Sequence, residues 1–153
     1  MSSSLLDAAS FALVVRHTPL VSIDLVVRDA SGALLVGLRR NRPAQNYWFV
    51  PGGRIARDES LDEAFRRICC AELGQHVERS SARFVGVYEH FYNDNFSGDP
   101  SFGTHYIVLA HALRLERPLA PPLEQHSDYL WLTNDELLAR PDVHPNTQAY
   151  CRS

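Results

Sequence analysis

The chain has 153 residues, a common length for one compact domain and enough to bury a core without disulfide bonds. Hydrophobic residues make up 45% of it, charged residues make up 22%, and no apolar run approaches the roughly 18 residues that a membrane-spanning helix needs. The net charge of −3 and the scatter of the basic residues argue against a nucleic-acid polymer as partner. We therefore expect a single domain over residues 1–153 with no membrane segment.

The N-terminal segment is typical of a helix and not of a secretory signal. Ser4 can cap a helix that runs over about residues 4–16, and Pro19 would end it. No cationic residue precedes the apolar ones, and Asp7 interrupts the apolar stretch. The three cysteines have neither the spacing of a zinc site nor that of a disulfide framework. These features predict a cytoplasmic protein.

Two β-rich runs follow, at residues 21–28 and 33–39, and the turn-forming residues between them predict an antiparallel hairpin. A short apolar strand at 47–50 then leads into Pro51-Gly52-Gly53. Two adjacent glycines permit backbone angles and close approaches that other residues forbid. We expect a turn at this point that lines a functional site.

The segment 53–75 is predicted to be a loop followed by a capped helix. Ser60 and Glu63 have the spacing of a capping box, and the apolar residues after them recur at helical intervals. Gly74 stands where helices commonly end in a left-handed residue. A well-bounded helix of this kind can hold side chains in fixed positions beside the preceding turn.

The second half of the chain alternates strands with short helices. Strands are predicted at 82–92 and 104–115, and the polar, glycine-containing loop 93–103 between them is a candidate lid. A strand near 129–132, a helix opened by Thr133 and Glu136, and a short C-terminal helix complete the chain. Because strands and helices interleave without a regular βαβ repeat, we predict an α+β fold with a mixed β-sheet sandwiched between α-helices.

The sharpest motif lies in the segment 53–75, which resembles the sequence box of the Nudix hydrolase family. The residues in register with that box are Gly53, Glu59, Arg67, Glu72 and Gly74. Ile68 and Ala71 stand where the family has two further glutamates. Carboxylates at all three helix positions would share one face and could hold two or three Mg²⁺ ions, so the remaining one predicts a single Mg²⁺ per active site, with Mn²⁺ as a substitute. Glu59 is expected to pair with Arg67 and to order the loop.

Outside the box the chain is similar to the GDP-mannose mannosyl hydrolases, a Nudix branch that lacks the same glutamates. The similarity runs over about residues 11–150 and is most specific at 39–45, 48–54, 91–98 and 124–126. It implies a homodimer that cleaves GDP-mannose, and also GDP-glucose, to GDP and free sugar. Water would attack C1 of the sugar with inversion, which needs a base on the face opposite the leaving group.

The resemblance also implies the site residues. His126 would be the general base, a role that suits a neutral imidazole near pH 7. Arg39, Arg54 and Tyr106 would stabilise the departing GDP, because guanidinium groups offer planar pairs of donors to phosphate. Asp24 and His90 would contact the sugar. The ligands of the Mg²⁺ would be Glu72, a backbone carbonyl of the Gly52-Gly53 turn and Gln125.

Two other functions remain open at the level of sequence. A conventional Nudix pyrophosphatase would attack phosphorus of a nucleotide sugar or nucleotide, although loss of two box glutamates argues against it. A non-catalytic nucleotide-sugar sensor would bind without turnover, although the retention of Glu72, Gln125 and His126 together argues against that. The sequence assigns no residue to the recognition of guanine.

Overall fold

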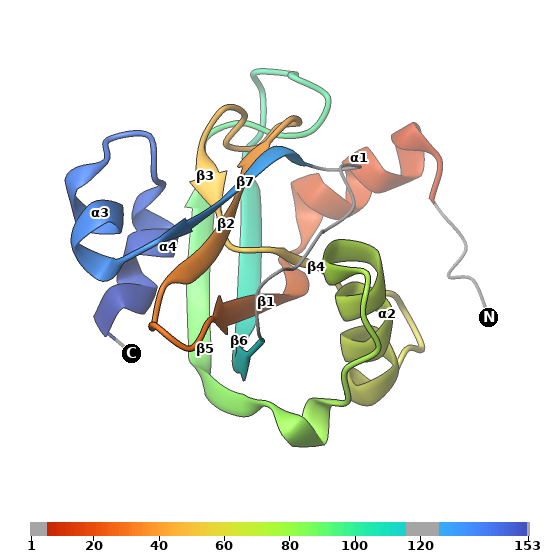
Figure 1. Ribbon diagram of the computed structural model, residues 1–153. Helices are drawn as coiled ribbons and strands as arrows, with labels where there is room; N and C mark the ends of the chain where they lie inside the picture. The colour runs from red at the N-terminus through yellow and green to blue at the C-terminus, as the bar shows by residue number, and fades with distance from the viewer. Residues whose placement is uncertain (1–5, 116–125, 153) are drawn as a thin grey trace.

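The computed structural model describes residues 6–115 and 126–152, which form a sheet with helices on both faces (Figure 1). The helices are α1 (Ala8–His17), α2 (Leu61–Leu73), α3 (Asn134–Ala139) and α4 (Pro145–Gln148), with 3₁₀ turns η1 (Arg79–Ser81) and η2 (Ala149–Arg152). The strands are β1 (Leu20–Arg28), β2 (Leu34–Arg39), β3 (Trp48–Phe49), β4 (Gly52–Arg54), β5 (Arg83–Tyr92), β6 (Thr104–Arg114) and β7 (His126–Leu132).

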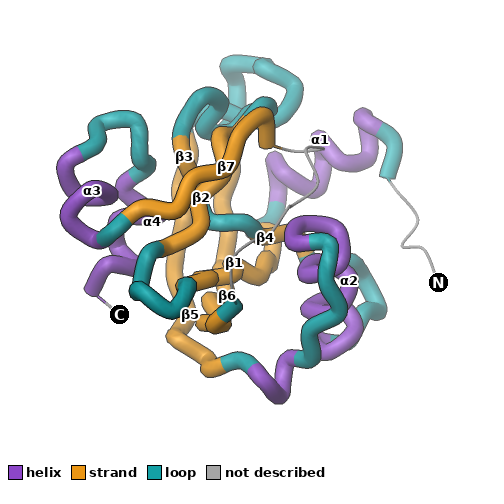
Figure 2. The backbone as a smooth tube through the Cα atoms, in the orientation of Figure 1, coloured by secondary structure: helices purple, strands orange, loops and turns teal. Residues whose placement is uncertain are grey.

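The sheet is mixed, as the sequence predicts. Its main path runs β3-β2-β1-β6-β5, with β4 paired to β1 and β7 paired to β2. β1 and β6 run parallel, and the other pairs are antiparallel. α1 and α2 cover one face of the sheet, and α3 and α4 lie on the other (Figures 1 and 2). The predicted sandwich of a mixed sheet between helices is therefore confirmed.

Each face of the sheet has its own apolar core, and β1 contributes to both. Ile23, Leu25 and Val27 pack in one buried cluster with the apolar side of α2. Val26 belongs to a second cluster, which includes Leu137 of α3 and Tyr150 of η2. Successive side chains of a strand point to opposite faces, so this alternation fixes the register of β1 in the sheet.

The sheet divides along one edge of β1, and this division opens the site. β1 pairs with β2 near its end, at Arg28 and Leu34, whereas it pairs with β4 over Ser22 to Asp24. The opposite edge of β1 is occupied by β6 along its whole length. β2 and β4 therefore leave the same edge of β1, and the space between them is open to side chains from both strands.

Two local predictions are corrected. The helix α1 begins at Ala8 and is capped by Asp7, whose carboxylate accepts from the Ser10 N–H at 2.8 Å. The predicted cap, Ser4, lies outside the described residues. The expected turn at Gly52-Gly53 is the strand β4. Asp7 stands directly before the first residue of the helix, and an Asp side chain caps a helix as well as a Ser side chain does.

The helix of the predicted box is confirmed. α2 is capped by Ser60, which accepts from the Glu63 N–H at 3.1 Å, and it ends at Gly74 with φ +68°. Thr133 and Glu136 form the predicted capping box of α3. In the described parts of the chain, no helix has the length and apolar character to cross a bilayer.

Candidate active-site pocket

A pocket of about 200 Å³ lies where β2 and β4 separate. It contains all of the predicted site residues whose side chains the structure describes, together with side chains that the sequence did not single out. Its lining consists of Ser22, Asp24, Arg39, Phe49, Val50, Gly52, Gly53, Arg54, Glu72, His90, Tyr92 and Tyr106. Residues from six strands and one helix thus meet at one place.

Glu72 and Gly52 form the side of the pocket that could hold a cation. The Glu72 side chain is buried, and its Oε1 accepts from the Gly52 N–H at 3.3 Å. The backbones of Pro51 and Ile55, on either side of β4, form hydrogen bonds with β1. Strand residues alternate in direction, so the Gly52 N–H and C=O both face away from β1 toward α2. A carboxylate and a carbonyl are the oxygen donors that Mg²⁺ prefers.

The two missing box glutamates have different structural consequences. Ile68 is 1% exposed and packs in the core, where its Cγ1 lies 3.0 Å from the position that a Cβ on Gly53 would take. Ala71 is exposed on the surface of α2. Among the described residues, no group of three or more His, Cys, Asp or Glu side chains could hold a metal ion. A cation here would therefore depend on Glu72, on backbone oxygen and on the substrate.

Glu59 and Arg67 order the loop before α2, as predicted. Arg67 donates from Nε to Glu59 at 2.6 Å and from Nη2 to the same carboxylate at 2.9 Å. These hydrogen bonds lower the pKa of Glu59 and raise that of Arg67. Arg67 Nη2 also donates to the Arg54 carbonyl at 2.8 Å. The ion pair thus fixes the backbone of a residue that lines the pocket.

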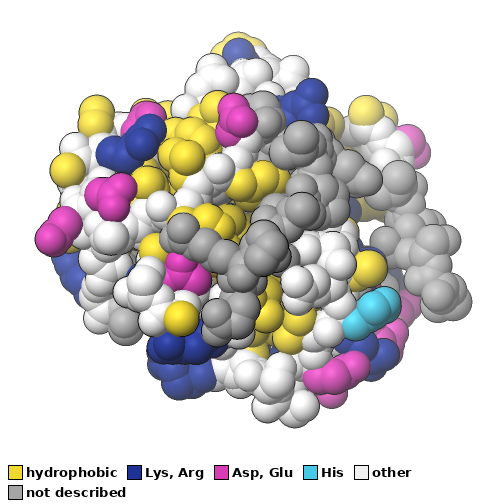
Figure 3. Space-filling view, in the orientation of Figure 1, with side chains coloured by type: hydrophobic (Ala, Val, Ile, Leu, Met, Phe, Trp, Pro, Cys, Tyr) yellow, Lys and Arg dark blue, Asp and Glu magenta, His cyan; other side chains and the backbone are white. Residues whose placement is uncertain are grey.

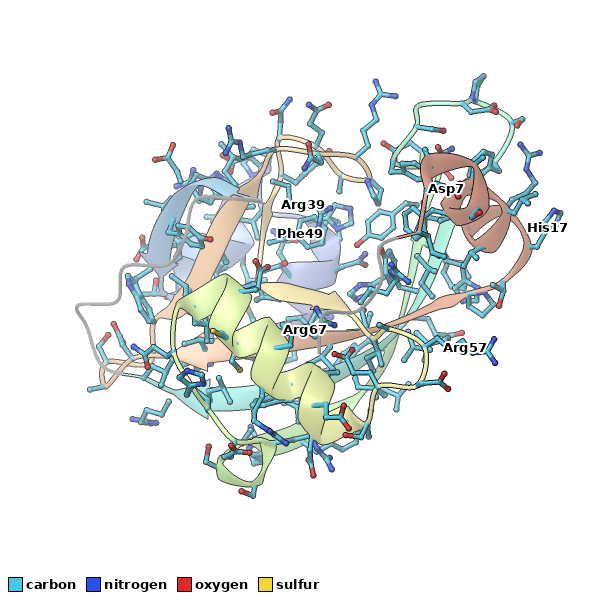
Figure 4. All side chains as sticks on the ribbon, turned by 90° about the vertical axis from the view of Figure 1, so that its right-hand side faces the viewer. Asp7, His17, Arg39, Phe49, Arg57 and Arg67 are labelled. Carbon is cyan, nitrogen blue, oxygen red and sulfur yellow. The ribbon has the colours of Figure 1, made fainter. Side chains whose placement is uncertain are left out.

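The two pocket arginines are held by aromatic rings. The Arg39 guanidinium lies 5.7 Å from the centre of the Phe49 ring, and Figure 4 shows the two residues side by side. The Arg54 guanidinium lies 4.8 Å from the ring centre of Phe11 on α1. Arg39 Nε is buried and has no hydrogen-bond partner in the described part of the chain. A guanidinium held over a ring, with donors still available, is suited to binding phosphate.

Asp24, His90 and Tyr106 line the same pocket, and burial shifts the pKa of each toward its neutral form. Burial raises the pKa of Asp24 to about 6, against the hydrogen bond from Tyr150 Oη at 2.7 Å and the charge of Arg39. Burial also lowers the pKa of His90 to about 4, so its imidazole is neutral at pH 7. Burial raises the pKa of Tyr106, which keeps its phenol protonated. Such groups can exchange hydrogen bonds with sugar hydroxyls and phosphate oxygens.

The two remaining predicted residues are Gln125 and His126, and His126 is the first residue of β7. The backbone of His126 pairs with Arg39, beside a register shift between Gly37 and Arg39. This pairing puts the His126 backbone next to a strand that lines the pocket. Its side chain and the whole of Gln125 lie outside the described residues. Their predicted roles therefore stay predictions.

The sequence did not identify two tyrosines that shape the pocket. Tyr92 lines it, and its hydroxyl accepts from Asn146 Nδ2 at 3.3 Å. It shares a face of β5 with His90, and this spacing of two residues could have revealed it. Tyr150 is fully buried and bonds to Asp24 from the far end of the chain. No local pattern in the sequence signals that contact.

The predicted lid, loop 93–103, folds on itself. Asn95 is fully buried, and its amide donates to the carbonyls of Asp99 at 2.8 Å and Phe102 at 2.7 Å. Phe96 packs on Phe11 of α1 with ring centres 4.7 Å apart. The loop is thus tied to α1 at the rim of the site, and its closure over a substrate stays a prediction.

Comparisons with known proteins agree with this geometry. The sequence model described as "NUDIX domain" matches residues 18–152. The chain is 40% identical over 114 residues to the low-salt glycan biosynthesis protein Agl8 of Haloferax volcanii, a match that covers 74% of this chain and 70% of that protein.

Solved structures share the fold at lower sequence identity. A MutT protein from Methanosarcina mazei superimposes with a TM-score of 0.70 at 18% identity, over 89% of this chain and 93% of that one. The NUDIX domain of Shewanella oneidensis NrtR, complexed with ADP ribose, superimposes with a TM-score of 0.64 at 17% identity, over 96% of each chain. These two likenesses bear on the fold alone.

Proposed function

The chain belongs to the Nudix family of hydrolases, and we propose that it hydrolyses GDP-mannose, and also GDP-glucose, to GDP and the free sugar. The observation that carries this proposal is the single pocket that unites Arg39 and Arg54 with Glu72, Asp24 and His90. Two cations and an acidic metal ligand suit a diphosphate. A neutral imidazole and a hydrogen-bonded carboxylate suit the hydroxyl groups of a sugar.

The proposed reaction is an inverting displacement at C1 of the sugar. The His126 imidazole takes a proton from water as the water oxygen bonds to C1, and the bond from C1 to the β-phosphate oxygen breaks with its electrons on GDP. Arg39 and Arg54 stabilise the charge that develops on the diphosphate, and Tyr106 donates to the same group. Because the diphosphate is a weak base, no side chain has to protonate it.

We propose that the site takes one Mg²⁺ ion, or Mn²⁺ in its place. Glu72, the Gly52 carbonyl and Gln125 would hold it, and when bound it would neutralise charge on the diphosphate. Ile68 and Ala71 leave the helix without further carboxylates. The absence of these carboxylates favours the single-metal reaction at carbon. A conventional pyrophosphatase relies on several carboxylates that bind metal, and in its reaction water attacks phosphorus.

The similarity to Agl8 supports a substrate of sugar metabolism, because that protein's name refers to glycan biosynthesis. We further propose that the chain acts as a cytoplasmic homodimer, as the resemblance to the GDP-mannose mannosyl hydrolases implies. Light scattering on the purified protein would measure twice the mass of the 17.2 kDa chain if the dimer forms.

The decisive experiment supplies GDP-mannose and Mg²⁺ in ¹⁸O-water and analyses the products by mass spectrometry and proton NMR. Label in first-formed β-mannose with unlabelled GDP supports the proposal. Label in GMP or mannose 1-phosphate would instead identify a pyrophosphatase. Binding of GDP-mannose without any product would favour the sensor.

Matched variants connect the activity to the proposed residues. His126→Gln and Glu72→Gln should each lower kcat by about 100-fold or more, given the usual worth of a general base or an electrostatic stabiliser. His17→Gln and Glu63→Gln are the controls, because both side chains are exposed, and Figure 4 shows His17 pointing away from the body of the protein. Full turnover in both site variants would reject the mechanism.

A further inference from the structure

A second cavity, of about 220 Å³, lies at the other end of β1 from the active-site pocket. We call it the arginine cavity, and its lining consists of Val26, Arg28, Arg83, Ala112, Leu113 and Arg114. Arg28 lies four residues beyond Asp24 on β1, which is about 13 Å along a strand. The two cavities share no lining residue.

Strand register brings the three arginines together. Arg28 on β1 pairs directly with Arg114 on β6. Arg83 on β5 pairs with Ala112, two residues before Arg114. Directly paired residues, and residues two apart on one strand, point to the same face of a sheet. Figure 3 shows Arg side chains gathered near the lower end of β5. The small side chain of Ala112 leaves open space between Arg83 and Arg114.

The described residues supply no acidic partner for this cluster. Arg28 donates only to neutral oxygens: Gly32 O at 2.9 Å, Asn134 Oδ1 at 3.0 Å and Tyr150 O at 3.2 Å. None of the ion pairs in the described part of the chain includes Arg28, Arg83 or Arg114, whereas several other arginines each face a carboxylate. Neighbouring like charges repel, and a bound anion would remove that repulsion.

We infer that the arginine cavity binds a phosphate group, as inorganic phosphate or as the phosphate of a small metabolite. Guanidinium groups match phosphate oxygens with planar pairs of donors. Three positive charges suit a group that carries between one and two negative charges better than they suit a single carboxylate. The volume of about 220 Å³ admits a phosphate group. The site is independent of the reaction that the active-site pocket performs.

The test follows the methyl resonances of Val26 and Ala112 by NMR while inorganic phosphate is added to the full chain in EDTA. These two paired residues line the arginine cavity on the face that carries Arg28 and Arg114, so their shifts are separate from binding at Arg39 or Arg54. We expect saturable shifts that chloride at equal ionic strength does not produce. The double variant R83Q/R114Q should raise the Kd by about tenfold or more, whereas the control R57Q/R66Q, which changes two arginines outside the cavity, should not.

A second measurement, the Tm, checks that the double variant is folded. Removal of two repelling charges should leave its Tm in phosphate-free buffer unchanged or higher, and phosphate should raise the Tm of the wild type more than that of the variant. Phenyl phosphate, titrated in the same way, distinguishes a free ion from a phosphorylated metabolite by which of the two binds more tightly. Unmoved methyls, or equal shifts with chloride, would overturn the inference.

Discussion

The hydrogen bond from Tyr150 to Asp24 offers a direct test of how the pocket is held. The Tyr150 side chain is fully buried, and its hydroxyl is 2.7 Å from Asp24 Oδ2. In the proposed function Asp24 contacts the sugar, so Tyr150 would be a positioning residue that acts through Asp24. Tyr150→Phe removes one oxygen and keeps the ring that packs against Tyr88, with ring centres 4.9 Å apart.

The size of the effect follows from the kind of bond that is lost. Removal of one partner from a buried hydrogen bond costs about 1–3 kcal/mol, and bonds to a carboxylate lie toward the upper end. If that cost falls on the complex with the sugar nucleotide, KM should rise by about 5- to 150-fold. The affinity for GDP alone should hardly change, because Arg39 and Arg54 bind the diphosphate.

Steady-state kinetics with GDP-mannose and calorimetric titration with GDP measure the two quantities separately. Tyr88→Phe is the matched control, since it removes a hydroxyl from the neighbouring ring and leaves the bond to Asp24 intact. An unchanged KM and kcat in a folded Tyr150→Phe protein would refute the positioning role. A parallel loss of sugar-nucleotide and GDP affinity would show that the substitution loosens the whole pocket.

Three further outcomes are expected. Gly52→Ala places a Cβ 2.5 Å from the Ile23 carbonyl oxygen, so Mg²⁺ should no longer raise the Tm of the variant; a wild-type response would contradict the steric argument. Glu59→Gln weakens the partly screened pair with Arg67 and should cost about 1 kcal/mol in urea unfolding, and no loss would mean the pair is dispensable. Burial lowers the pKa of His90 from 6.5 to about 4, so its stabilising contribution is complete above pH 6.5 and is lost toward pH 4. The loss is at most about 3 kcal/mol, and His90→Gln should flatten this part of the stability–pH curve.

Local patterns predicted most of the helices and strands. The caps at Ser60, Gly74 and Thr133 involve neighbours in sequence, so their residue types are sufficient to locate them. The Gly-Gly sequence of β4 predicts a turn, because glycine has low strand propensity. Its pairing with Asp24 depends on β1, almost 30 residues away. The parallel pairing of β1 with β6 likewise leaves no local signal.

Prediction of the candidate site depends on the same difference between local patterns and contacts of distant residues. Glu72 and Arg67 are in register with a sequence box, and Asp24, His90 and Tyr106 follow from resemblance along the whole chain. Tyr150 could not be predicted, because its contact with Asp24 joins residues 126 positions apart. It also depends on how η2 packs below the sheet. Prediction from sequence therefore extends to residues that line the pocket and to partners close together in the chain, such as Glu59 and Arg67, and it fails for a distant partner such as Tyr150.

The two departures from the Nudix box are not equivalent, and the difference bears on whether the box is a relic. At position 71 the side chain is exposed among the described residues, so a glutamate there could be lost without consequence for their packing. Ile68 is instead part of the core and lies against Gly53, beside the strand that carries Gly52. A glutamate at this position would bury a carboxylate among apolar side chains, at a cost that only a bound cation could offset. The isoleucine makes the packing of α2 on β4 independent of metal, while Glu72 stays directed at the Gly52 N–H. Glu72 keeps its contact with the Gly52 N–H although the other two box glutamates are absent. This retention supports the proposed site for one metal ion and argues against a box that has lost its function.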